Sequence, residues 1–236
     1  MKSQNENSII SKISRWEHKA YIALKGMVLV MRRLGGISIC ALLCVSLLSG
    51  CGSSLASDES IVSVSKKGKV TAIDVESFEA SYYDEEELRS FVKTAVDEYN
   101  TTHEKGAVKM KQLSVADAVA TVEMHYKTVA DYAEFNGIEL YQGTNVQALA
   151  EGYDFEVEWA AVEDGVMGQT VSKAEIFESD DWKVVIIKAN TDVKVDGKIC
   201  YVSIENVEVT GKDTVSIGMG DAESFETDVY TYIIYK

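Results

Sequence analysis

The chain has 236 residues, of which 46 % are hydrophobic and 26 % are charged, a balance typical of a folded globular protein rather than a disordered one. Its formal net charge is −15, and the residues after position 50 carry 16 basic against 36 acidic side chains, a net charge of −20. Such a charge repels phosphate backbones and anionic lipid surfaces, so it argues against nucleic-acid binding and favours a cationic partner or simple solubility.

The first predicted element is an apolar segment that follows Arg32 and Arg33. It reads LGGISICALLCVSLL, about fifteen residues, which is the length of a signal-peptide core and shorter than the roughly 20 residues that a membrane-spanning helix needs. Residues 1–30 fit the basic region of an export signal poorly, because they include acidic residues and a long polar stretch. We therefore expect translation to start later, at Met27 or Met31.

The apolar segment ends in the motif LSGC at residues 48–51, and this motif resembles the bacterial lipobox. The resemblance implies that a diacylglyceryl group is attached to the Cys51 sulfur and that signal peptidase cleaves between Gly50 and Cys51. The alternative is a buried core helix with three ordinary cysteines, Cys40, Cys44 and Cys51. The order of paired arginines, apolar core, small residues and polar tail favours the lipobox.

Lipidation at Cys51 predicts a protein held on the extracytoplasmic face of the cell membrane. Two acyl chains anchor a protein stably, whereas one chain of myristoyl length gives only marginal binding of about 10⁴ M⁻¹. Residues 51–60 are then a lipidated flexible tether, and residues 61–236 are expected to form a single globular domain. The whole pattern resembles the small lipoproteins of Gram-positive, clostridia-like bacteria, which implies a location and an anchor but no activity.

The first part of this domain predicts a β-hairpin followed by a helix. Residues 61–75 alternate apolar and polar side chains on both sides of a Lys-Lys-Gly-Lys turn. Apolar residues at helical spacing from Leu88 to Tyr99 predict an amphipathic helix of about four or five turns. Asp84 can cap its first turn while Glu87 reaches back, and metal binding is the alternative use of these carboxylates.

The rest of the chain predicts mainly strands. Residues 108–115 and 118–126 alternate as strands, and capping residues indicate two short helices at 128–137 and 144–152. After these helices the pattern is almost wholly β, with predicted strands at 155–162, 181–189, 198–209, 213–219 and 228–236. The predicted fold is α+β, an antiparallel sheet system packed on one long amphipathic helix, with a strand-rich C-terminal half.

The search for chemistry finds residues that mostly have structural explanations. His125 lies in an alternating strand, and His103 follows the long helix, where a cation favours the helix dipole. Cys200 has no second cysteine nearby and is interpreted as a small hydrophobic residue or a free thiol. The segment 190–198 lacks the ligand pattern of an EF-hand and is interpreted as a hairpin arm. We assign no catalytic, cofactor-binding or metal-binding residue.

Two surfaces are candidates for binding. Tyr230 and Tyr232 are expected on one strand face and Tyr235 on the other. The tyrosines either form an aromatic face that binds a peptide or glycan, or they pack at the edge of a sheet. The segments 131–137 and 140–145 are the second candidate, because connections between short helices often carry function.

The function predicted from the sequence is a noncatalytic binding or assembly module, with an unknown envelope or surface protein as its partner. The first alternative is an enzyme of the cell envelope that uses paired carboxylates from the turns around Asp154, Asp164 or Asp180. The second alternative is a transporter-associated ligand-binding protein, which the absence of a βαβ pattern disfavours.

Overall fold

The computed structural model describes residues 59–80, 83–218 and 227–236. The lipobox, its cleavage point and the expected starts at Met27 and Met31 lie outside the described residues. The described α-helices are α2 (Glu85–Thr102), α3 (Val129–Asn136) and α4 (Asn145–Ala150), and a short 3₁₀ helix η1 covers Glu175–Phe177. No helix in the described ranges is long and apolar enough to span a membrane.

The strands form two sheets. The seven-stranded sheet has the spatial order β11 (Val207–Val209), β12 (Thr214–Ile217), β9 (Asp192–Val195), β1 (Ile61–Val64), β2 (Val70–Ser77), β4 (Val119–Tyr126) and β3 (Val108–Ala116). The six-stranded sheet has the order β5 (Leu140–Thr144), β8 (Lys183–Ile187), β13 (Thr231–Tyr235), β10 (Ile199–Ser203), β6 (Trp159–Glu163) and β7 (Val166–Val171). Neighbouring strands are antiparallel except β1 and β9, which run parallel.

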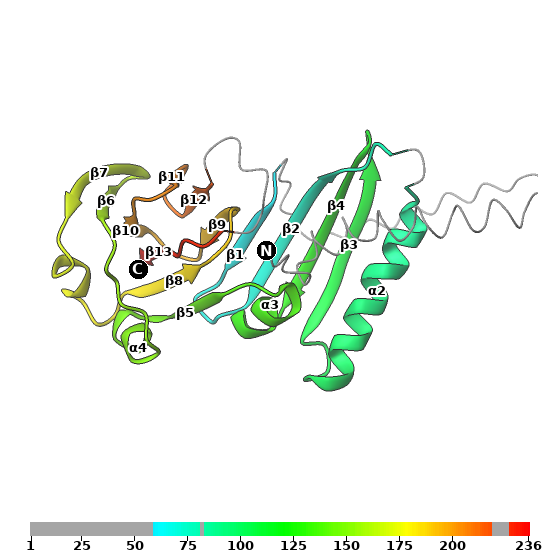
Figure 1. The fold of residues 1–236 in the computed structure, drawn as a ribbon, viewed down its shortest axis with the longest axis horizontal. Coiled ribbons are helices and arrows are strands. Elements are labelled where there is room, and N and C mark those ends of the chain that lie inside the picture. The colour runs from blue at the N-terminus through cyan, green and yellow to red at the C-terminus, as the bar shows by residue number, and fades with distance from the viewer. Residues whose placement is uncertain (1–58, 81–82, 219–226) are drawn as a thin grey trace, which may run out of the picture.

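Helix α2 lies along β3 and covers one face of the β2–β4–β3 part of the seven-stranded sheet (Figure 1). Asp84 is its N-cap and accepts a hydrogen bond from Glu87 N at 2.9 Å, as the sequence predicts. The helix buries Leu88, Val92 and Val96, which repeat at helical spacing and form one stripe. The α2 stripe therefore packs on the apolar face that the alternation of β4 provides.

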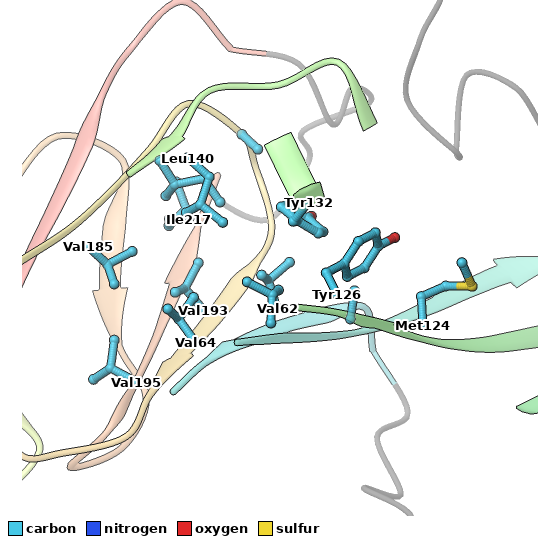
Figure 2. Close-up of a cluster of buried hydrophobic side chains, with 14 of the residues drawn as sticks. Val62, Val64, Met124, Tyr126, Tyr132, Leu140, Val185, Val193, Val195 and Ile217 are labelled. Atoms are coloured by element: carbon cyan, nitrogen blue, oxygen red, sulfur yellow. The ribbon is translucent and has the colours of Figure 1, made fainter. Parts of the chain in front are cut away.

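One hydrophobic cluster joins the two sheets. It includes Val62 and Val193 from the seven-stranded sheet together with Val185 and Ile233 from the six-stranded sheet. Figure 2 shows these side chains continuing from Val185 through Val193 and Val62 to Met124. The core of the described residues is therefore shared between the sheets, and neither sheet has to bury its inner face alone.

The central strands β8 and β13 of the six-stranded sheet are buried on both faces. Val185 and Ile187 of β8 point into the shared cluster, whereas Val184 and Ile186 belong to a second cluster with Phe155 and other aromatic residues near α4. Burial on both faces explains why β8 and β13 are nearly continuous apolar runs instead of alternating ones.

The predicted α+β class is confirmed, and the predicted helix of four or five turns is α2, but the description of the sheets as packed on one long helix is not supported. The longest helix, α2, has 18 residues, and α3 and α4 cover other parts of the sheets. The expected single antiparallel sheet system is wrong, because the strands divide into two sheets and one pair is parallel. The physical reason is that both faces of the central strands β8 and β13 require covering, which one helix on one face cannot supply.

Several local predictions are confirmed, and a few need correction. Gly68 has a φ of 75° in the predicted hairpin turn, and the α3 cap at Thr128 and stop at Gly137 are as expected. Residues 140–144 are a strand instead of a loop, and β7 was not predicted. The predicted strand 198–209 is two strands, because Asn206, with a φ of 56°, turns the chain between β10 and β11.

Candidate functional site

The face of the seven-stranded sheet opposite α2 carries a row of polar side chains. Ser63 of β1 pairs with Thr71 of β2 on one side and with Lys194 of β9 on the other. Thr71 pairs in turn with His125 of β4, and His125 pairs with Lys109 of β3. Side chains of directly paired residues point to the same face of a sheet, so these five residues form one line across five strands. We call this line the polar row.

The polar row exists because buried and outward-facing side chains alternate in β1, β4 and β9. In β4, Ala120, Val122, Met124 and Tyr126 are buried, whereas the residues between them face away from the shared core. In β1 and β9 the valines are buried in the same way, which leaves Ser63 and Lys194 on the polar face.

A groove of about 700 Å³ lies over the polar row and is lined by all five of its residues. This volume is within the range of about 300–1,000 Å³ that small-molecule sites occupy. The groove also reaches Ser65, Lys69, Lys127, Asp196 and Asp213, which flank the row at the ends of the strands. The polar row is therefore the floor of a concave surface large enough to hold a small molecule.

The groove has an excess of positive charge. Four lysines and two aspartates line it, although the whole chain has a net charge of −15. Lys194 Nζ pairs with Asp213 Oδ2 at 3.3 Å, and Lys127 Nζ pairs with Glu104 Oε1 at 2.6 Å. Within the described ranges, Lys69 and Lys109 have no ion-pair partner, and neither does Asp196, whose carboxylate accepts a hydrogen bond from Lys66 N at 3.3 Å. The groove therefore keeps two unpaired ammonium groups against one unpaired carboxylate.

Glycine at position 106 gives Lys109 its place beside the groove. Gly106 has a φ of 70°, and a Cβ atom there would lie 2.7 Å from Lys109 Cε. The end of the Lys109 side chain therefore lies against the backbone of Gly106, and the left-handed φ at this position favours glycine.

Ser63 is unusual among the groove residues because its hydroxyl lacks a partner. Its Oγ and Asn145 Oδ1 are the two buried side-chain polar atoms without a hydrogen bond in the part of the chain that the structure describes. A buried polar group without a partner costs about 1–3 kcal/mol. Ser63 lines the groove, and the described residues leave the hydrogen-bonding capacity of its hydroxyl unused.

His125 is oriented by its neighbour on the same strand face. Its Nε2 lies 2.7 Å from Glu123 Oε1, and the exposed fractions of the two side chains are 39 % and 18 %. Ser63 and His125 are two strands apart, about 10 Å at normal strand spacing, which is too far for a direct hydrogen bond. These two residues are therefore not a nucleophile and its base in this arrangement.

His103 has a structural role that links two helices. Its Nδ1 lies 2.9 Å from Tyr99 O, and its Nε2 lies 3.1 Å from Glu134 Oε1 of α3. The ring stacks on Tyr99 with the centroids 3.7 Å apart. The hydrogen bond to the Tyr99 carbonyl is the main cause of a raised His103 pKa, with a smaller contribution from Glu134. His103 joins the end of α2 to α3 and does not line the groove.

The other sequence candidates also lie apart from the groove. Cys200 is partly buried in β10, and burial raises the pKa of its thiol, which makes it a poor nucleophile. A hydrogen bond from Lys198 is the main cause of a lowered Asp164 pKa. Asp154 Oδ1 accepts from Glu156 N at 3.0 Å, and Asp180 is exposed. None of these three aspartates lines the groove, so none of them forms a carboxylate pair there.

Segment 190–198 forms β9 as predicted, but it is not a hairpin arm, because β9 pairs with β1 and β12. Asp196 Oδ2 accepts from Lys66 N at 3.3 Å. No group of three or more His, Cys, Asp or Glu side chains that could hold a metal ion occurs in residues 59–80, 83–218 and 227–236.

The C-terminal tyrosines pack in the interior. Tyr232 is 3 % exposed in the second cluster and Tyr235 is fully buried in the shared cluster, so the predicted alternation is confirmed. Tyr230 donates a hydrogen bond to Glu139, and Lys188 Nζ lies 5.3 Å from the centre of its ring. These side chains fill and border the core, which leaves no aromatic binding face on β13.

One carboxyl group that the sequence search missed has a strongly perturbed pKa. Burial raises the pKa of Asp74 to about 7, and the nearby charge of Glu76 adds to the effect. Asp74 is on the α2 side of β2, paired with Val122, and its charge contributes to the raised pKa values of Tyr126 and Tyr132. In the sequence, Asp74 follows Val70 and Ala72 at every second position, and this alternation indicates that its carboxyl lies on the face that α2 covers.

Comparison of this chain with protein-family models, with curated proteins and with solved structures finds no match.

Proposed function

We propose that this chain is a lipid-anchored extracytoplasmic lipoprotein that acts as a noncatalytic binding module, with the groove over the polar row as its binding site. The groove carries the proposal, because it combines a concave shape, two unpaired lysines and an unsatisfied hydroxyl in one place. Pockets in which a few polar groups converge are the usual sites of ligand binding.

The anchoring half of the proposal rests on the LSGC motif. Lipid at Cys51, after cleavage behind Gly50, would place residues 52–60 between the membrane and the domain. Nine extended residues reach about 30 Å at most, so the domain would stand within that distance of the bilayer. The partner would then be an envelope or surface component.

Binding is favoured over catalysis by what the groove contains. It offers ammonium groups, hydroxyls and one imidazole, but in the described residues the His125 ring is hydrogen-bonded to Glu123 and to no hydroxyl of the groove, although Thr71 lies on the neighbouring strand. The carboxyl with a raised pKa, Asp74, lies on the opposite side of the sheet and does not line the groove. An envelope enzyme with paired carboxylates therefore stands second, and a transporter-associated ligand-binding protein stands third.

The test is capture of envelope components by the full-length protein on intact cells, using a crosslinker. The variant Lys69→Gln/Lys109→Gln removes both unpaired ammonium groups of the groove. The control Lys93→Gln/Lys212→Gln removes two lysines that pair with Asp97 and Asp164 outside it. Binding in the groove predicts a crosslinked species that the first variant loses and the control keeps. A species that both variants keep would place the binding surface elsewhere.

A further inference from the structure

The groove also indicates the chemical class of its ligand. We propose that it binds a phosphate ester carried on a hydroxyl-rich body, with the phosphate between Lys69 and Lys109. This inference rests on the proposed function of the groove and specifies the chemical class of the ligand that the groove binds.

The position of the phosphate follows from the strand register. Lys69 is the last residue of the turn before β2 and precedes Thr71 by two residues, and Lys109 pairs with His125, which itself pairs with Thr71. Both ammonium groups therefore flank the pair of Thr71 and His125 from the side of the groove. A dianionic group there would meet two charges that have no other partner in the described part of the chain.

The donors suit phosphate better than a planar carboxylate. Lysine acts as a point charge on phosphate, whereas arginine supplies the fork that matches a carboxylate, and no arginine lines the groove. The Thr71 hydroxyl can donate a further hydrogen bond to a phosphate oxygen, which has room for several donors.

The rest of the groove fits a body with hydroxyl groups. The polar row from Lys109 to Lys194 crosses four strand spacings, about 19 Å, which is longer than a phosphate group alone. Ser63 lies beside Lys194 in this row with an unsatisfied hydroxyl, and Asp196 lies at the edge of the row as an acceptor. A ligand hydroxyl could accept from Ser63 or donate to Asp196, which neutral polyols do well.

The distribution of charge favours a small soluble phosphate ester over an anionic membrane surface as the ligand. The chain has a net charge of −15, so an anionic bilayer is repelled by the molecule as a whole. A small phosphate ester can enter the groove and experience mainly the nearby lysines, because charges more than about 8–10 Å away are largely screened at physiological salt.

The test is titration calorimetry of the full-length protein with glucose 6-phosphate, inorganic phosphate and glucose, together with sedimentation on phosphatidylglycerol vesicles. We expect glucose 6-phosphate to bind, glucose not to bind, and inorganic phosphate to bind more weakly. Lys69→Gln/Lys109→Gln should weaken glucose 6-phosphate binding by about tenfold or more, because it removes two charge-assisted contacts. Lys93→Gln/Lys212→Gln should leave the affinity unchanged.

The Ser63→Ala variant distinguishes a binding role of Ser63 from a structural role. It should weaken glucose 6-phosphate binding by a few-fold while the folded protein becomes no less stable, because the deleted hydroxyl has no partner in the free protein. Circular dichroism and the thermal midpoint of every variant show whether it is folded.

Three results would overturn the inference. They are no binding of glucose 6-phosphate at about 10 mM, equal loss of binding in both double variants, and binding to phosphatidylglycerol vesicles without binding to the soluble ester. If groove-dependent capture on cells persists in any of these cases, the phosphate-ester inference fails while the proposed binding function stands. If that capture is also absent, both fail.

Discussion

At the scale of single residues, the Ser63 hydroxyl occupies a position that folding alone does not favour, because it is buried without a hydrogen bond. Natural proteins keep few such groups, and those that remain are often functional. The cost of leaving Ser63 unsatisfied is therefore an argument that something binds there. Lys69 and Lys109 are exposed and have no ion-pair partner in the described ranges, so their charges are available to a ligand.

The stability effect of Ser63 can be measured in the absence of ligand. Ser63→Ala should raise the free energy of unfolding by about 1 kcal/mol, because a shielded hydroxyl without a partner is removed and little volume is lost. Urea unfolding of the two proteins measures the difference. Ser203→Ala is the matched change, since the Ser203 hydroxyl accepts from Tyr232 N at 3.0 Å, and its loss should destabilise. A Ser63→Ala protein that is less stable than wild type would contradict the assignment.

Asp74 predicts a pH-dependent stability. Its pKa is raised from 3.8 to about 7 by burial and by Glu76, so the folded state holds a proton that the unfolded chain releases. Stability should therefore fall as the pH rises from about 4 through about 7. Asp74→Asn imitates the protonated carboxyl, and it should be more stable than wild type by about 4 kcal/mol at pH 8, because the pKa is raised by about three units at about 1.4 kcal/mol each, and similar to wild type at pH 4.

Urea unfolding at a series of pH values measures the effect of Asp74. Glu208→Gln, at an exposed position on β11, is the control and should keep the wild-type pH dependence. If Asp74→Asn and wild type lose stability in parallel between pH 4 and pH 8, the raised Asp74 pKa is wrong.

The candidate site was not predictable from single residues. Its members come from five strands between Ser63 and Lys194, and the local sequence around each one indicates only an alternating strand. His125 was interpreted as structural because the pairing that places Thr71 and Lys109 beside it depends on contacts far apart in the chain. Net charge was misleading as well, since an acidic total conceals a basic groove.

At the scale of elements, strong local patterns in the sequence predicted helix caps and strands correctly. Asp84 and Thr128 cap α2 and α3, and the alternation in 119–126 gave β4 almost to its bounds. Pairing was harder, because β1 and β9 are 131 residues apart and run parallel without a local cue. Strand β5 was missed because its five residues lie between two helices and carry turn-forming Gly143.

The cap of α2 predicts a measurable loss of stability. Asp84→Ala removes the acceptor of the 2.9 Å hydrogen bond from Glu87 N and should lower the free energy of unfolding by about 1 kcal/mol. Glu98→Ala, at an exposed position in the same helix, should change it by less than about 0.5 kcal/mol. Urea denaturation distinguishes the two, and equal effects would show that the cap does not stabilise α2.

At the scale of the whole molecule, the two sheets act together through one core. The cluster that contains Val62 and Val185 joins the sheets, and α2 stabilises the part that carries the groove. The groove floor is thus built on strands whose other face is packed, which holds the polar row in a fixed geometry. A rigid floor suits the proposed binding module, which would present one binding surface to its surroundings.

The shared core predicts that the groove and the six-stranded sheet lose structure together. Val185→Ala, in β8, should destabilise the protein by about 2 kcal/mol, because it empties space in the shared cluster. Amide hydrogen exchange should then rise in β1 and β2 as well as in β8. Faster exchange in β8 alone would show that the sheets unfold separately.

The claim on which location, tether and partner class all depend is the fate of the Cys51 sulfur. Intact-mass spectrometry of the native protein purified from membranes tests it most directly. The account predicts a chain whose first residue is Cys51, heavier than the polypeptide by a diacylglyceryl group. A chain that still contains Gly50 and carries an unmodified Cys51 thiol would contradict it.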